Sequence, residues 1–149
     1  MVTMLSVIRR IVAEPLKWMG LAGIIVVLGQ GTVLAEDKVS LLMKQRLSDM
    51  AGKEATVLTV DYAPGAASES HVHPGSVFAY VLEGTVVSQL EGQTPMTYTK
   101  GQSWYESPKH PHIVSRNGSK TEPARLLVFL LSQEGEVIKA PMKAGNARK

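Results

Sequence analysis

The stretch GAASESHVH (residues 65–73) decides the fold, because it places two histidines two positions apart in a segment typical of a β-strand. Successive side chains of a strand point to opposite faces, so His71 and His73 project from the same face, and Glu69 would share it. Two imidazoles on one face form half of a site for a divalent metal. The other two histidines of the chain, His110 and His112, repeat the same spacing further along.

Composition limits the kinds of site that the chain can build. The chain has 149 residues and no cysteine, with 44% hydrophobic and 19% charged residues. One compact domain is expected at this length, and the balance of apolar and charged residues argues against global disorder. The lack of cysteine excludes a disulfide scaffold, a thiolate zinc site, an iron–sulfur cluster and a cysteine nucleophile. A metal site would therefore be built from histidine and oxygen ligands.

The first 35 residues have the order of a secretory signal peptide. Residues 1–17 are basic, with Arg9 and Arg10, residues 18–35 carry no charge, and the segment ends in VLA at 33–35. This order predicts cleavage after Ala35 and export to the periplasm or the medium. The alternative is an uncleaved membrane anchor through residues 18–35, which is at the short limit for a spanning helix.

The rest of the chain is dominated by short apolar runs of period two, separated by turn signals such as Pro-Gly, Glu-Gly and Lys-Gly. The strands that these runs predict cover residues 55–62, 77–82, 85–90, 96–99, 103–106, 113–115, 125–131 and 136–140. Only residues 39–47 fit a helix. So many short strands predict an all-β sandwich or barrel rather than βαβ units. We expect one folded domain over residues 36–141 and a frayed tail over residues 142–149.

Two motifs around the histidines resemble those of the cupin family. Residues 65–84 match the first motif, G-x5-H-x-H-x3,4-E-x6-G, at both glycines and both histidines. The second motif, G-x5-P-x-G-x2-H-x3-N, matches at Gly101 and His112. The resemblance extends over about residues 54–131, which is most of the predicted domain.

The resemblance implies a double-stranded β-helix, a jelly-roll barrel, for residues 36–141. In the family, the histidines that match His71, His73 and His112 bind a divalent metal inside the barrel. Iron, manganese, nickel and zinc are all open as the bound ion. Several cupins with three-histidine iron sites are dioxygenases, so a small chelating substrate is the expected ligand.

The chain departs from both motifs. Val77 stands where the first motif has its glutamate, so the family's carboxylate ligand is missing. In the second motif Ser107 replaces proline, Lys109 replaces glycine, and Arg116 precedes Asn117 where asparagine is expected first. Three neutral imidazoles without a carboxylate would leave the full charge on a divalent ion.

Two residues near the motifs are candidates to complete the site. Glu69 is a possible substitute carboxylate by strand alternation, although a loop before His71 would turn it out to solvent, which we favour. We interpret His110 as a solvated bystander. The candidate pocket residues are Tyr80, Gln89, Trp104 and Tyr105. Trp104 and Tyr105 are adjacent, so only one of the pair can face the barrel interior. Tyr80 is an odd number of positions from Val77, which favours the outer face for its side chain.

We weigh three functions. The first is an exported metal-dependent dioxygenase, the second a non-catalytic cupin that binds a small ligand or senses metal, and the third a barrel with an empty apolar pocket. No catalytic residues are assigned, and no G-x-S-x-G motif is present. No basic patch with interleaved aromatics indicates nucleic acid binding. Phe78, Tyr80 and Leu82 would form an apolar strip on the outer face, which predicts a homodimer.

Overall fold

The regular structure is made entirely of β-strands in residues 37–142, the part of the chain that the computed structural model describes. The predicted signal peptide or anchor, and all but the first residue of the predicted tail, lie outside these residues. Within the described part, no helix is long and apolar enough to cross a membrane.

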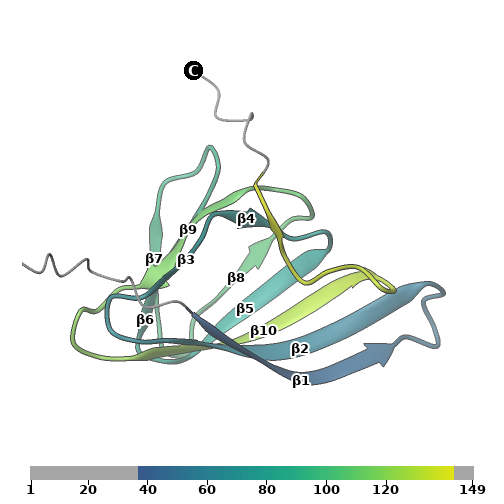
Figure 1. Ribbon diagram of the computed structural model, residues 1–149, viewed down its shortest axis with the longest axis horizontal. Helices are drawn as coiled ribbons and strands as arrows, with labels where there is room; N and C mark the ends of the chain where they lie inside the picture. Colours follow the sequence, from purple (N-terminus) through teal and green to yellow (C-terminus); the bar gives the residue numbers. More distant parts are fainter. Residues whose placement is uncertain (1–36, 143–149) are drawn as a thin grey trace, which may run out of the picture. The chain divides into compact units, whose positions relative to one another are not determined.

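One sheet has five strands, and every neighbouring pair in it is antiparallel. Figure 1 shows these strands running side by side. In spatial order they are β1 (Lys38–Arg46), β2 (Lys53–Tyr62), β10 (Ala124–Gln133), β5 (Ser76–Glu83) and β8 (Ser103–Glu106).

The second sheet is also antiparallel, and it carries His71 and His112. Its strands in spatial order are β11 (Ala140–Pro141), β4 (His71–Val72), β9 (His112–Asn117), β6 (Thr85–Leu90) and β7 (Met96–Thr99), and β3 (Ala67–Ser68) also pairs with β9. The chain crosses repeatedly between the sheets, since β5, β8 and β10 lie in the first and β6, β7 and β9 in the second. This arrangement confirms the predicted all-β double-stranded β-helix.

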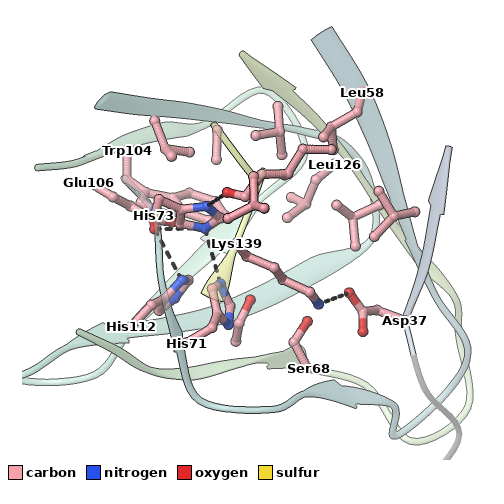
Figure 2. A pocket seen from close by; sticks show the side chains of 18 of the residues that line it. Asp37, Leu58, Ser68, His71, His73, Trp104, Glu106, His112, Leu126 and Lys139 are labelled. Atoms are coloured by element: carbon pink, nitrogen blue, oxygen red, sulfur yellow. Dashed lines mark hydrogen bonds and ion pairs between the residues drawn. The ribbon is translucent and has the colours of Figure 1, made fainter. Parts of the chain in front are cut away.

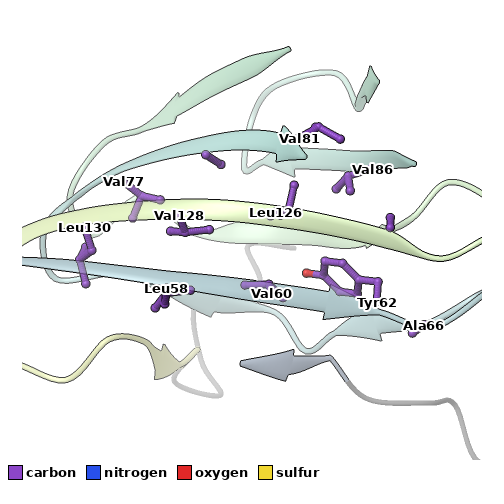
Figure 3. Close-up of a cluster of buried hydrophobic side chains, with 12 residues drawn as sticks. Leu58, Val60, Tyr62, Ala66, Val77, Val81, Val86, Leu126, Val128 and Leu130 are labelled. Carbon is purple, nitrogen blue, oxygen red and sulfur yellow. The ribbon is translucent and has the colours of Figure 1, made fainter. Parts of the chain in front are cut away.

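The core lies between the sheets and follows the alternation of the strands (Figure 3). On β5, Val77, Ala79 and Val81 are buried, whereas Phe78 and Tyr80 are exposed, as the sequence predicted. The neighbouring strands β2 and β10 add further apolar side chains to the same inner face. These are Leu58, Val60, Leu126, Val128 and Leu130.

Two segments differ from what the sequence suggested. Residues 39–47 were the only candidate for a helix, and residues 38–46 form strand β1 instead, because almost the whole segment pairs with β2 and the sheet outweighs local helix preference. The predicted strand at 136–140 is reduced to Ala140–Pro141. The residues before it leave the sheet pattern, and the Ile138 carbonyl there forms a hydrogen bond with the His73 ring.

The departures from the second motif have clear structural consequences. Lys109 adopts a left-handed backbone with φ of 59°, the conformation that the motif's glycine would take without strain. Asn117, one position later than the motif's asparagine, is buried. Its amide donates hydrogen bonds to the carbonyls of Ala63 (3.1 Å) and Glu122 (2.8 Å), and its side-chain oxygen accepts one from the Ser119 backbone N–H (2.8 Å). Asn117 therefore ties the end of β9 to two loops.

Candidate metal centre

Three histidines converge on one point inside the barrel. Strands β4 and β9 pair with His71 directly opposite His112, and His73 follows immediately after β4. One ring nitrogen of each histidine lies within 4.8 Å of those of the other two. All three side chains are buried. Figure 2 shows the rings of His71, His73 and His112 pointing toward one another at one side of the cavity. The structure thus brings together the three residues that the motifs singled out.

Backbone carbonyls fix the orientation of His71 and His73. The Nδ1 atom of His71 lies 2.6 Å from the Glu69 carbonyl oxygen, and Nδ1 of His73 lies 2.6 Å from that of Ile138. A carbonyl oxygen only accepts, so each Nδ1 carries the hydrogen and each Nε2 of a neutral ring keeps its lone pair. The two Nε2 atoms are 3.0 Å apart. Two lone pairs facing each other at this distance repel, and a cation or a proton between them would relieve the repulsion.

Burial keeps these two rings neutral. It lowers the pKa of His71 to about 4, and the charges of neighbouring groups add to the effect. Burial also lowers the pKa of His73, although the hydrogen bond to Ile138 and the charge of Glu106 oppose it. A proton is therefore disfavoured between the two Nε2 atoms at neutral pH. Neutral imidazole is the form in which histidine binds metal.

His112 is held by a side chain instead of the backbone. Its Nε2 atom lies 2.8 Å from the hydroxyl oxygen of Ser88 on β6. Its Nδ1 atom is directed to the other side, 3.2 Å from Oε2 of Glu106. The ring nitrogen of His112 that faces the Glu106 carboxylate is therefore Nδ1.

Glu106 is a member of this cluster that sequence reasoning missed. It ends strand β8 with 3% of its surface exposed, and its Oε1 accepts a hydrogen bond of 2.8 Å from Nε1 of Trp104. Its Oε2 lies 3.2 Å from His112 Nδ1 and 3.7 Å from His73 Nε2. Burial alone would raise the pKa of Glu106, but the close contact with His112 holds it below its usual value. The available signal was alternation, since Trp104 and Glu106 share one face of the predicted strand 103–106.

These donor atoms fit a divalent metal ion. Glu106 Oε2 and His112 Nδ1 are both buried and lack a hydrogen bond of acceptable geometry, which is costly for polar atoms unless a further group satisfies them. Ligand nitrogens and oxygens lie about 2.0–2.2 Å from an ion such as zinc, so neighbouring ligands are about 3 Å apart. The separations of 3.0 and 3.2 Å are close to this value, and 3.7 Å is somewhat larger. The histidine nitrogens as a set spread to 4.8 Å, so a bound ion would draw the three rings closer together.

A cavity of about 490 Å³ opens from the cluster. Its walls are mainly apolar side chains of the first sheet. These include Leu58, Val60, Val77, Ala79, Leu126 and Val128. An ion pair also lines the cavity, away from the histidines. In it, Nζ of Lys139 lies 3.3 Å from Oδ2 of Asp37 (Figure 2). The cavity therefore combines a potential metal centre with space for a small, largely apolar molecule.

Glu69 and His110 do not line this cavity. Glu69 is exposed and contributes only its backbone carbonyl, as a partner of His71. The Nε2 atom of His110 lies 2.8 Å from the Glu91 carbonyl oxygen. The placement of Glu69 agrees with the interpretation that we favoured from the sequence. His110 lies outside the site as expected, but its ring is half-buried and held by the Glu91 carbonyl rather than solvated.

Of the four candidate pocket residues, only Trp104 lines the cavity. Tyr105 is 50% exposed and Tyr80 is also exposed, so the expectation that one member of the adjacent pair faces inward is met by Trp104. Gln89 donates its amide hydrogen to the Gln93 carbonyl, 2.9 Å away.

The fold and the site define a double-stranded β-helix domain with an internal histidine cluster. The model of the cupin domain matches residues 58–130, which include all three histidines. Residues 58–130 therefore form a domain of the cupin family.

Solved structures show the same fold. A cupin-like protein from Thermotoga maritima MSB8 is 20% identical, with a TM-score of 0.56 over 71% of this chain and 75% of that one. A protein with a double-stranded β-helix domain from Klebsiella pneumoniae is 21% identical, with a TM-score of 0.55 over 70% and 83%. DMSP lyase DddQ from Ruegeria pomeroyi DSS-3 is 22% identical, with a TM-score of 0.52 over 59% and 43%, so this chain spans less than half of the lyase. At these identities the likeness concerns the fold alone, and no curated protein matches the chain.

Proposed function

We propose that this protein is a metal-dependent cupin in which His71, His73 and His112 hold a divalent ion next to a small-molecule cavity. The observation that carries the proposal is the 3.0 Å approach of two unprotonated Nε2 atoms. Iron, manganese, nickel and zinc all accept imidazole and carboxylate ligands, so the donor set leaves the identity of the ion open.

The finer proposal is a dioxygenase, in which both atoms of O₂ enter a small chelating substrate. A bound redox-active ion would supply Lewis acidity and electron exchange with O₂. The protein would supply the rest: the apolar walls exclude water, and the histidines, held through their far ring nitrogens, keep their positions as substrate enters. The alternative is a cupin that binds the ligand or senses the metal without catalysis.

Elemental analysis of the purified protein tests the metal proposal. Wild type and His73→Ala are exposed separately to Fe(II), Mn(II), Ni(II) and Zn(II), and excess metal is removed. We expect about one equivalent of at least one metal in wild type and a large loss in the variant. If wild type retains no more metal than His73→Ala, the proposal is wrong. O₂ consumption on a panel of diketones, phenols and thiols then separates a dioxygenase from a non-catalytic cupin.

We further propose export and a homodimer. Export rests on the leader at residues 1–35, and mass spectrometry of the mature N-terminus would test cleavage after Ala35 against retention as a membrane anchor. The dimer rests on a group of aromatic rings on the outer face of the first sheet, where Phe78 lies 5.2 Å from Tyr105 and 6.5 Å from Phe129 between ring centroids. Light scattering of wild type and Phe78→Asp would test it, since the charge should produce monomers.

A further inference from the structure

We propose that Glu106 is a fourth ligand of the metal, which replaces the carboxylate that the cupin motif has at the position of Val77. In this protein the acidic ligand would come from strand β8 instead of β5. The inference rests on the proposed function, because it requires a metal at the three histidines.

The register of the sheet explains how the carboxylate can change strands. Strands β5 and β8 are antiparallel neighbours, and Val77 lies directly opposite Glu106. Both side chains point to the interior, with exposed fractions of 1% and 3%. Directly opposite residues of a sheet have Cβ atoms about 5 Å apart on the same face, so a carboxylate at either position reaches the same space. Val77 is small and apolar, which leaves that space to Glu106.

The contacts of Glu106 orient it as a ligand. Trp104 holds Oε1, which leaves Oε2 directed at the histidines. Oε2 lies between His112 Nδ1 and His73 Nε2, at 3.2 and 3.7 Å, and it has no hydrogen-bond partner of its own. A carboxylate oxygen that is this deeply buried needs a group that satisfies it. A divalent ion bound to the histidines would provide one.

The competing role for Glu106 is to position His112 by accepting a hydrogen bond from Nδ1, while Nε2 binds the metal. This role requires Nε2 of His112 to be free, whereas it lies 2.8 Å from the hydroxyl of Ser88. Nε2 of His112 is thus engaged by Ser88, whereas Nδ1 of His112 and Oε2 of Glu106 are the buried atoms without a hydrogen bond, and we assign these two as the ligands.

The first test uses Co(II), whose absorption spectrum reports coordination number and ligand type. Glu106→Gln keeps the shape of the side chain and removes its charge, and Glu69→Gln is the matched control at an exposed carboxylate. Loss of a residue that only supports a ligand costs about 10–100-fold in metal affinity. We expect Glu106→Gln to lose about 100-fold or more with an altered Co(II) spectrum, and Glu69→Gln to match wild type in both. Circular dichroism of the metal-free proteins checks that each variant is folded.

The outcomes separate this inference from the proposed function. If wild type binds no metal, the proposed function is wrong and the inference falls with it. If wild type binds Co(II) and Glu106→Gln shows the same affinity and spectrum, only the inference is wrong. A weaker affinity with an unchanged spectrum would also overturn it, because Glu106 would then position His112 without binding the ion.

A second test moves the carboxylate back across the sheet. Glu106→Val should bind Co(II) weakly, and Val77→Glu in the same chain should recover at least about tenfold of the lost affinity, because the two positions face each other. A folded double variant that binds no better than Glu106→Val would contradict the shared space on which the inference depends. If the double variant does not fold, Glu106→Gln decides the question.

Discussion

The two H-x-H pairs of the chain have the same spacing and different outcomes. In the first pair, His71 lies in β4, His73 follows directly, and both rings point into the cavity. In the second pair, only His112 lies in a strand, because β9 begins there. His110 belongs to the preceding turn, where its N–H donates to the Ser107 carbonyl at 3.3 Å and its ring contacts the Glu91 carbonyl.

The difference shows what the spacing itself contributes. Two side chains at i and i+2 share a face only if the backbone between them is extended. Lys109, with φ of 59°, and Pro111, which lacks a backbone N–H, interrupt the extended chain around His110. In the second pair, the His112 ring therefore lies in the site and the His110 ring lies outside it.

The largest effect should come from alanine substitutions in the second pair. We expect His112→Ala to weaken metal binding by about 100-fold or more, because it removes a ligand. His110→Ala should leave the affinity unchanged. Competition with a chromophoric chelator measures both. A comparable loss in the two variants would mean that the pairs are equivalent, contrary to the structure.

Metal binding should also stabilise the fold through the first pair. A ligand at 100 times its Kd that binds only the folded state adds about 2.7 kcal/mol to the free energy of unfolding. Urea denaturation with and without metal should show this gain in wild type and in His110→Ala. His71→Ala should show none. Stabilisation that persists in His71→Ala would place the metal elsewhere in the chain.

The partners of the two rings in the second pair give a smaller contrast. Ser88 holds His112 at 2.8 Å, so Ser88→Ala should lower metal affinity about tenfold through a less fixed ring. Ser107 lies 3.4 Å from Nδ1 of His110, and Ser107→Ala is the matched control that should have no effect. Calorimetric titration of both variants checks the contrast, and equal affinities would show that Ser88 does not orient a ligand.

Much of the fold was readable because most strands have local signatures. The buried and exposed positions of β5 follow strict alternation, and the motif histidines meet as expected. The strand β1 was missed because its residues are almost all exposed, and only pairing with β2 holds it extended. The segment before Ala140 was missed for the opposite reason, since its conformation depends on the contact of Ile138 with His73, which is distant in sequence.

The missing part of the site has the same physical origin. Val77 indicated that the carboxylate of the motif was lost. The strand that pairs with β5, and the register of that pairing, are properties of the folded sheet and could not be predicted from the motif. Glu106 is far from the first motif in sequence and reaches the histidines only through that register. The hydrogen-bond partners of the rings are likewise two backbone carbonyls and a serine that no spacing rule selects.

The turn that joins the two pairs offers the smallest effect. The Lys109 backbone N–H donates to the His73 carbonyl at 2.7 Å, so the turn that excludes His110 also contacts the first pair. A left-handed backbone costs a residue with a side chain about 1–2 kcal/mol, while glycine costs more entropy on folding. Lys109→Gly should therefore raise the free energy of unfolding by about 0.5–1 kcal/mol in urea denaturation, with metal affinity unchanged.

Lys109→Ala is the control, because alanine keeps a Cβ atom and should therefore retain the backbone penalty and bring no gain in stability. If both variants stabilise the protein equally, the gain comes from removing the charge of Lys109 and not from relieving backbone strain, and the strain assigned to this turn is wrong.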